Sequence, residues 1–307
     1  MTPVPQLPDK QRPAPSVRSL NQWLRDAEAQ SGLSQQWLGW QLASTVVVAA
    51  LQRAIGPDAT PLFLVKGGVY VQLQLGEKAI TRATKDIDTL FRGTVDEFAT
   101  SLRQVITQPW GPFSLETTPV ERIEGVRRLV KPCRFDVRLM VKGAVWRRVR
   151  VEVSFPEGQI ATDTQPVPAP PIGFFGLDTP DHLAGIVMDY QIAQKLHACT
   201  DPDTPAWIND RVRDVIDVNL LHKHFYPGDP PPGLRAACLD LFDARAAEAT
   251  QLGDPSRHWP PTVIANNQWR VLFPDLATAV GLEETLDQAV AALNQWIRGI
   301  DETKGAL

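Results

Sequence analysis

Two aspartates separated by one isoleucine are the residues whose types and spacing best suit chemistry. Asp86 and Asp88 lie in the stretch "TKDIDTLF" at residues 84–91. Side chains at positions i and i+2 of a β-strand point to the same face, so both carboxylates point one way while Ile87 points into the core. Two adjacent carboxylates repel each other, and a divalent cation relieves that repulsion. Oxygen ligands suit Mg²⁺, so the pair predicts a magnesium site.

A third carboxylate lies in a later segment, "RRVRVEVSF" at residues 147–155. Its valines alternate with polar residues, which predicts a strand with one buried face and one polar face. Glu152 is on the polar face together with Arg148 and Arg150. A third acid on a neighbouring strand would complete a clamp for two metal ions in phosphoryl transfer, and Glu152 is the candidate.

A glycine pair follows the short apolar run "PLFLV" at residues 61–65. Lys66, Gly67 and Gly68 come between this predicted strand and a predicted helix over residues 69–76. Without side chains, backbone N–H groups and a helix N-terminus can approach a phosphate closely. Lys66 and Arg82 add positive charge, so this turn is a candidate nucleotide-binding segment.

The sequence predicts that the elements that position these residues form an α+β domain. Periodicity predicts two helices over residues 19–54, broken near Gly32, with Ser34 as a possible N-cap. It predicts strands at 61–65 and 86–91, then a helix over 95–107 with Thr94 as N-cap. Further strands are predicted at 113–118, 120–130, 133–141 and 147–155, which together would form a mixed sheet with flanking helices.

The chain is predicted to divide into a tail, a head domain, a linker and a helical domain. Residues 1–17 are rich in proline, which predicts a flexible tail. The head domain is predicted over residues 18–160, the linker over 161–180 and the helical domain over 181–307. Thr179 and Pro180 predict the start of its first helix. A second helix is predicted over residues 206–224, where Asp210, Asp214 and Asp217 would share one face.

Composition narrows the class of protein. The chain has 307 residues, 43% hydrophobic residues and a formal net charge of −4. Its three cysteines have wide spacings, which argues against a disulfide framework or a zinc ribbon. We expect no signal peptide, because the first residues contain no apolar segment. We expect no membrane span, because the longest apolar run is too short to cross a bilayer. A cytoplasmic protein is the expectation.

These motifs resemble the minimal nucleotidyltransferase fold of the DNA polymerase beta superfamily and, within it, the AbiEii/AbiGii toxin family. The family pattern of a strand, KGG and a helix, followed by R-x-T-x-D-[IV]-D, is matched by Lys66–Gly68 and Arg82–Asp88. The resemblance implies that Asp86 and Asp88 bind metal and that Glu152 takes the place of a third acid, usually Asp. Val69 stands where the family usually has Ser or Thr.

The resemblance extends into the helical domain. The stretch "AQKLHA" at residues 193–198 is similar to the family's A-[EQ]-K-L-x-A, with Gln194 in place of a frequent Glu. The stretch "RDVIDV" at 213–218 is similar to R-D-x-x-D-[LV]. The resemblance implies that Lys195 holds nucleotide phosphates and that activity needs Asp214. Lys195 and Asp214 are also predicted to pair.

The resemblance implies a Mg²⁺-dependent toxin that transfers NMP from an NTP, such as ATP or CTP, to the 3′ acceptor end of tRNA and so blocks translation. An antitoxin partner is implied as well. Ten basic residues between 121 and 150 favour an RNA-binding surface next to the acids, with Arg147 and Arg148 as the residues to test. The alternatives are a small-molecule or protein acceptor, a nucleotide-binding protein with a lapsed site, and a metal nuclease.

Overall fold

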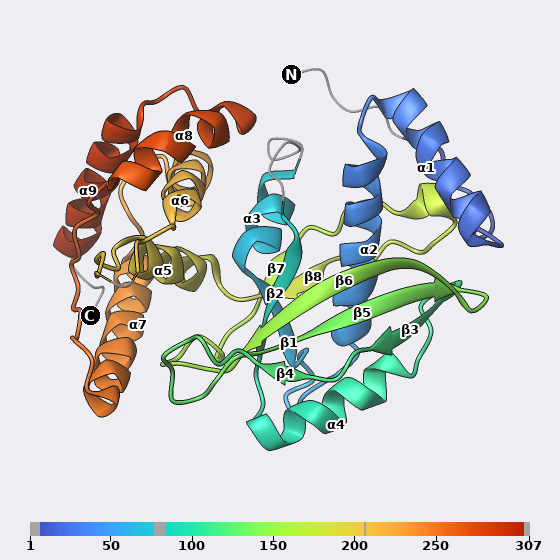
Figure 1. Cartoon of the computed structure of the whole chain (residues 1–307), viewed down its shortest axis with the longest axis horizontal. Coiled ribbons are helices and arrows are strands. Elements are labelled where there is room, and N and C mark those ends of the chain that lie inside the picture. The colour runs from blue at the N-terminus through green and yellow to red at the C-terminus, as the bar shows by residue number, and fades with distance from the viewer. Residues whose placement is uncertain (1–6, 77–83, 206, 304–307) are drawn as a thin grey trace. The chain divides into compact units, whose positions relative to one another are not determined.

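The computed structural model describes residues 7–76, 84–205 and 207–303, and it divides into two compact units (Figure 1). The first unit comprises residues 1–156 and 164–185, and the second comprises 157–163 and 186–307. The chain therefore passes between the units three times. No helix of the described residues is long and apolar enough to cross a membrane.

The first unit begins with two helices, as the sequence predicts. Helix α1 (Val17–Ser31) ends at Gly32, whose φ of 74° gives the left-handed C-cap that glycine favours. Helix α2 (Gln35–Leu51) begins at Ser34, whose side chain accepts a hydrogen bond from the Trp37 N–H. Most of α2 is buried, because it is apolar on nearly all sides and lies in the core of the unit.

A mixed sheet organises the first unit. Its strands are β1 (Phe63–Lys66), β2 (Asp86–Phe91), β3 (Phe113–Thr117), β4 (Glu121–Arg122), β5 (Cys133–Val141), β6 (Ala144–Ser154), β7 (Gln165–Val167) and β8 (Leu183–Gly185). The strand order in the described residues is β3-β5-β6-β2-β1-β8-β7, and β4 pairs with β5 beside β3. Strand β2 runs parallel to β6 and antiparallel to β1, so the predicted mixed sheet is confirmed.

One face of the sheet is apolar and the other is polar. Burial alternates strictly along β5, and in β6 Val149, Val151 and Val153 are buried while Arg148 and Arg150 are exposed. On the apolar face, Phe63, Phe91 and Phe98 pack with ring centroids 5.0–6.0 Å apart. Phe98 belongs to α4 (Val95–Ile106), which begins with the capping box of Thr94 and Glu97.

Two predicted elements differ from those that the structure shows. The strand predicted over residues 120–130 is only two residues long, because Val126, Leu129 and Val130 are exposed and have no sheet to cover them. The helix predicted from Thr179 starts later. Residues 183–185 instead form β8, which pairs with β1, and the Thr179 hydroxyl accepts a hydrogen bond from the Ile172 N–H.

Segments expected as a tail and a linker take part in the packing of the first unit. The Lys10 N–H donates to the Gly173 carbonyl at 3.0 Å, and its ammonium lies 4.7 Å from the Trp23 ring centroid. Ala14 is 2% exposed. The expected linker contains β7 and the short 3-10 helix η2 (Gly173–Phe175), so apolar residues within these proline-rich stretches hold them against the unit.

The second unit is helical. Its helices are α5 (Met188–Cys199), α6 (Val212–Phe225), α7 (Pro232–Leu252), α8 (Asn267–Ala279) and α9 (Leu286–Glu302). Helix α7 begins with proline at its first position, and α9 begins with the capping box of Thr285 and Gln288. Among the described residues, the largest fully buried side chain is Trp269 of α8, which is 0% exposed.

Candidate active site

The strand register brings the acid of β2 between a lysine and a glutamate. Lys66 lies opposite Asp88 in the antiparallel pair of β1 and β2, and Asp88 lies opposite Glu152 in the parallel pair of β2 and β6. Asp86 lies opposite Arg150. Residues paired across neighbouring strands point to the same face, so these side chains gather on the polar face of the sheet. Ile87, between the two aspartates, points to the opposite face and is buried.

Gly67 sits directly against Asp88. Its φ is +63°, in the left-handed region, and a Cβ built on it would lie 2.1 Å from Oδ2 of Asp88. Any side chain at this position would therefore displace the carboxylate as well as strain the backbone. The glycine turn at the start of α3 (Gly67–Leu75) is what allows the backbone and the carboxylate to approach each other.

The three carboxylates influence one another electrostatically. The pKa of Glu152 is raised, first because the side chain is half-buried and then because Asp88 and Asp86 are negative; Arg134 and Arg150 oppose the rise. A carboxylate gains such a shift when like charges lie near it without enough compensation. Glu152 is therefore a half-buried carboxyl close to the negative charges of Asp88 and Asp86.

The donor chemistry suits a divalent cation, but the placement of the side chains is looser than a formed metal site. Among the described residues, no group of three His, Cys, Asp or Glu side chains is close enough to hold a metal ion. Asp86, Asp88 and Glu152 nevertheless present only carboxylate oxygens, which are the ligands that Mg²⁺ prefers.

In the second unit, Lys195 lies between two carboxylates. Its Nζ is 2.6 Å from Oδ1 of Asp214 and 2.7 Å from Oδ2 of Asp217, so the predicted pair of Lys195 and Asp214 is confirmed. The side chains of Lys195 and Asp217 are 7% and 2% exposed, and that of Asp214 is 13% exposed. Asp214 is therefore the member of the cluster most open to solvent. Sequence reasoning gave Asp217 a place on the helix face but missed its contact with Lys195.

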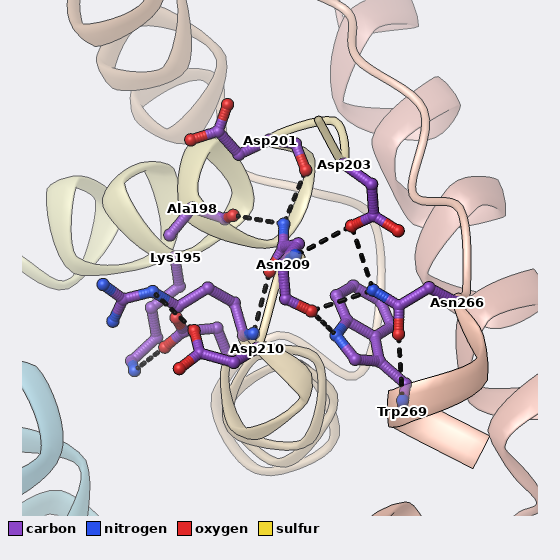
Figure 2. Close-up of polar contacts among 10 residues, drawn as sticks. Lys195, Ala198, Asp201, Asp203, Asn209, Asp210, Asn266 and Trp269 are labelled. Atoms are coloured by element: carbon purple, nitrogen blue, oxygen red, sulfur yellow. Dashed lines mark hydrogen bonds and ion pairs between the residues drawn. The ribbon is translucent and has the colours of Figure 1, made fainter. Parts of the chain in front are cut away.

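Asp210 does not join this acidic face, contrary to the sequence prediction. Helix α6 begins only at Val212, and Asp210 is an exposed residue before it, 3.8 Å from Arg211. Figure 2 shows the reason: Asn209 stops the helix by donating its side-chain amide to the carbonyls of Ala198 and Asp201.

The same asparagine joins the loop before α6 to α8. The Asn209 N–H donates to Asp203, and the Asn209 carbonyl accepts hydrogen bonds from Asn266 and from Nε1 of Trp269 (Figure 2). Asn209 is 2% exposed. This buried network fixes where α6 begins and so fixes the position of Asp214, three residues after Arg211.

The basic stretch is partly neutralised within the first unit. Arg148 and Arg150 both pair with Asp136, at 3.1 and 3.3 Å, and Arg134 pairs with Glu121. A bulge in the pairing of β5 and β6 precedes Arg147, whose guanidinium lies against Gly39 of α2. Arg147 therefore lies on the helix-covered face, whereas Arg148 lies on the face that carries the acids. Arg82 lies outside the described residues.

Comparison with known proteins decides the family. The family model described as "Nucleotidyl transferase AbiEii toxin, Type IV TA system" matches residues 49–295. The chain belongs to the AbiEii nucleotidyltransferase toxin family. The resemblance read from the sequence motifs is thereby confirmed, and this AbiEii-family protein is a nucleotidyltransferase. No match was found among curated proteins.

One solved structure supports the same fold. MenT4, a nucleotidyltransferase toxin from Mycobacterium tuberculosis, is similar to this AbiEii-family protein with a TM-score of 0.55 and 15% identity, over 92% of this chain and 90% of MenT4. A protein from H. pylori described as a nucleotidyltransferase has a TM-score of 0.41 and 15% identity, over 87% of this chain and 96% of its own. The shared fold rests on MenT4.

Proposed function

We propose that this protein transfers a nucleotide from an NTP to the 3′ end of tRNA in a reaction that depends on Mg²⁺. The observation that carries the proposal is the register of Lys66, Asp88 and Glu152 across three adjacent strands beside the Gly67 turn. This arrangement offers a cation, carboxylate oxygens and a side-chain-free turn on one face, which are the groups that nucleotidyl transfer requires.

Asp86, Asp88 and Glu152 would hold the metal. When bound, Mg²⁺ supplies charge that stabilises the phosphate oxygens of the reacting nucleotide. Burial raises the pKa of Glu152 most, and the negative charges of Asp88 and Asp86 raise it further; a bound cation would offset the repulsion among these carboxylates.

Gly67 and Gly68 would contact the phosphates through backbone N–H groups at the start of α3, and Lys66 would add a positive charge. Arg82 is proposed for the same role from the sequence pattern. In the second unit, Lys195 is proposed to act with Asp214. Because two carboxylates hold its ammonium, it would serve the phosphates only as part of that cluster.

In the proposed reaction, the oxygen of the tRNA 3′-hydroxyl attacks the α-phosphorus, and Glu152 is the proposed acceptor of the hydroxyl proton. The bond between the α-phosphorus and the oxygen bridging to the β-phosphate breaks, and pyrophosphate leaves. The in-line geometry requires both partners to be held, so an RNA-binding surface must exist. Arg148 and Arg150 are its candidates, because they are 58% and 53% exposed on the face that carries the acids. Phosphate contacts from such side chains supply affinity without sequence preference.

The membership in a toxin family supports a biological role as the toxin of a toxin–antitoxin pair. Transfer to the acceptor end would block aminoacylation and so stop translation. A cognate antitoxin is the proposed protein partner, and the cytoplasm is the proposed compartment because tRNA is the proposed substrate.

The test is a labelling experiment. Purified protein is incubated with Mg²⁺, each α-labelled NTP in turn and total tRNA, and the RNA is separated on a denaturing gel. Label in full-length tRNA supports the proposal and names the nucleotide, and R148E/R150E should lower the labelling and weaken its dependence on salt. Label in protein or in small molecules instead would show that the acceptor is not tRNA. Shortened RNA would indicate a nuclease.

A further inference from the structure

A buried carboxylate of the second unit joins three of its segments. Glu157 accepts two hydrogen bonds from Arg245 of α7, at 3.0 and 2.8 Å, and a third from the Gln194 amide of α5, at 2.9 Å. The side chains of Glu157 and Arg245 are 8% and 19% exposed. A bidentate pair of this kind fixes geometry as well as charge. Glu157 therefore fastens the segment 157–163 to both helices.

A second carboxylate fastens the same segment. Asp240 of α7 accepts hydrogen bonds from the Gln159 N–H at 2.7 Å and from the Tyr190 hydroxyl at 2.8 Å. Gly158, with φ +54°, makes room for it, since a Cβ there would lie 2.2 Å from the Asp240 carboxylate. The turn at residues 157–159 is thus shaped to receive side chains from α7.

Two arginines converge on the next residue of this face of α5. Nδ1 of His197 accepts hydrogen bonds from Arg245 at 2.8 Å and from Arg257 at 2.9 Å. Arg257 also donates to the His197 carbonyl at 2.8 Å. With two guanidinium donors aimed at it, Nδ1 is the acceptor nitrogen of the ring.

These contacts all lie along one stripe of α5. Tyr190, Gln194 and His197 are at positions i, i+4 and i+7, which share a helix face. Lys195 is one position after Gln194 and so points about 100° away, toward the carboxylates of α6. Helix α5 is held from one direction by Glu157 and Arg245, and from another by Asp214 and Asp217.

We infer that Glu157, Arg245 and Gln194 are positioning residues that set the rotation of α5 and thereby place Lys195 against Asp214. A side-chain tip about 6 Å from a helix axis moves roughly 1 Å when the helix turns by 10°, which is enough to break a short hydrogen bond. The functional part of this inference rests on the proposed role of Lys195. The structural part does not.

A charge-swap series tests the inference. Q194E places a second carboxylate against Glu157, and E157Q removes the charge that Arg245 requires. The double variant E157Q/Q194E restores one carboxylate and one amide to the pair. Coupling between the two positions is therefore expected, with each single variant impaired and the double variant close to the wild type. R270M, which breaks an exposed ion pair with Asp287, is the matched control.

The readout is the rate at which an amine-reactive acylating reagent modifies Lys195, followed by mass spectrometry in the full-length protein. Lys195 should be protected in the wild type and should react at least about tenfold faster in Q194E and E157Q, because protection depends on local opening. The exposed Lys223 should react at the same rate throughout. Circular dichroism checks that each variant is folded, and E157Q alone carries the test if Q194E does not fold.

Equal protection of Lys195 in the wild type and in the folded single variants would overturn the inference, as would a double variant no better than the singles. Where nucleotide transfer is measurable, the single variants should lower kcat more than they raise KM. If no variant or wild type transfers a nucleotide, the acylation result still stands, so failure of the proposed function and failure of this inference are distinguishable.

Discussion

At the scale of single residues, the candidate site depends on one glycine. Gly67→Ala should destabilise the protein by about 2 kcal/mol or more, because it forces a side chain into the left-handed region and against Asp88. It should also lower nucleotide transfer sharply. Urea denaturation and the labelling assay measure the two effects.

Gly125→Ala is the matched control, because nothing lies within 4 Å of a Cβ built at Gly125. Its stability and its transfer activity should equal those of the wild type. If Gly67→Ala behaved like this control, the close approach of Gly67 to Asp88 would have no consequence for the site.

Glu152 makes a prediction about pH. A carboxyl whose pKa is raised in the folded state favours the protonated form, so its ionisation costs stability as the pH rises above the ordinary glutamate value of about 4.3. Glu152→Gln in metal-free protein should therefore raise Tm at pH 7. The gain should shrink as the pH is lowered and should vanish below that ordinary value.

The same measurement with Mg²⁺ adds a second comparison. Mg²⁺ should raise the Tm of the wild type more than that of Glu152→Gln, because the variant has lost a proposed ligand. A variant that is less stable than the wild type at pH 7 without metal would contradict the electrostatic description of the polar face.

Sequence reasoning predicted the residues of this face well and their surroundings poorly. The i, i+2 spacing of Asp86 and Asp88 and the valine alternation around Glu152 follow directly from strand geometry. The positive φ of Gly67 and the contact between Lys195 and Asp217 depend on tertiary packing, which a single sequence does not display.

At the scale of elements, Asn209 decides where α6 begins. Asn209→Ala should cost about 3 kcal/mol, because it removes two part-buried hydrogen bonds to the carbonyls of Ala198 and Asp201 and one acceptor for the Arg211 N–H. Denaturation with urea checks this, with Thr204→Ala in the exposed part of the same loop as control. A loss no larger than that of Thr204→Ala would show that the network in Figure 2 does not hold the loop.

The strands with clear alternation were predicted best. The bounds of β2 and β5 agree with the sequence prediction, because both strands have one face in the core. The start of α5 was predicted too early, because Leu183–Gly185 are apolar in a way that suits a helix or a short buried strand equally, and pairing with β1 decides between them. The start of α6 was also predicted too early, since periodicity does not reveal the side-chain contacts of Asn209.

At the scale of the whole molecule, the second unit takes a segment from the middle of the chain. Residues 186–307 expressed alone would lack Glu157 and would leave Arg245, whose side chain is 19% exposed in the full chain, without its carboxylate. Such a loss costs about 3–5 kcal/mol. In this fragment Arg245→Met should therefore raise stability, whereas in the full chain it should lower stability because Glu157 is then unpaired.

Chemical denaturation of the four proteins measures these opposite signs. The full-length chain and the fragment serve as each other's controls, since the substitution is the same in both. A substitution that destabilises the fragment as it does the full chain would show that Glu157 is not what compensates Arg245.

The central claim is that the carboxylates beside Gly67 carry out nucleotidyl transfer. The most direct test is the rate of label transfer from an α-labelled NTP to tRNA by the wild type and by Asp88→Asn, with Asp26→Asn on the surface of α1 as control. We predict that Asp88→Asn transfers at least about 10³-fold more slowly while it remains folded, and that Asp26→Asn equals the wild type. Transfer by folded Asp88→Asn at the wild-type rate would contradict the account.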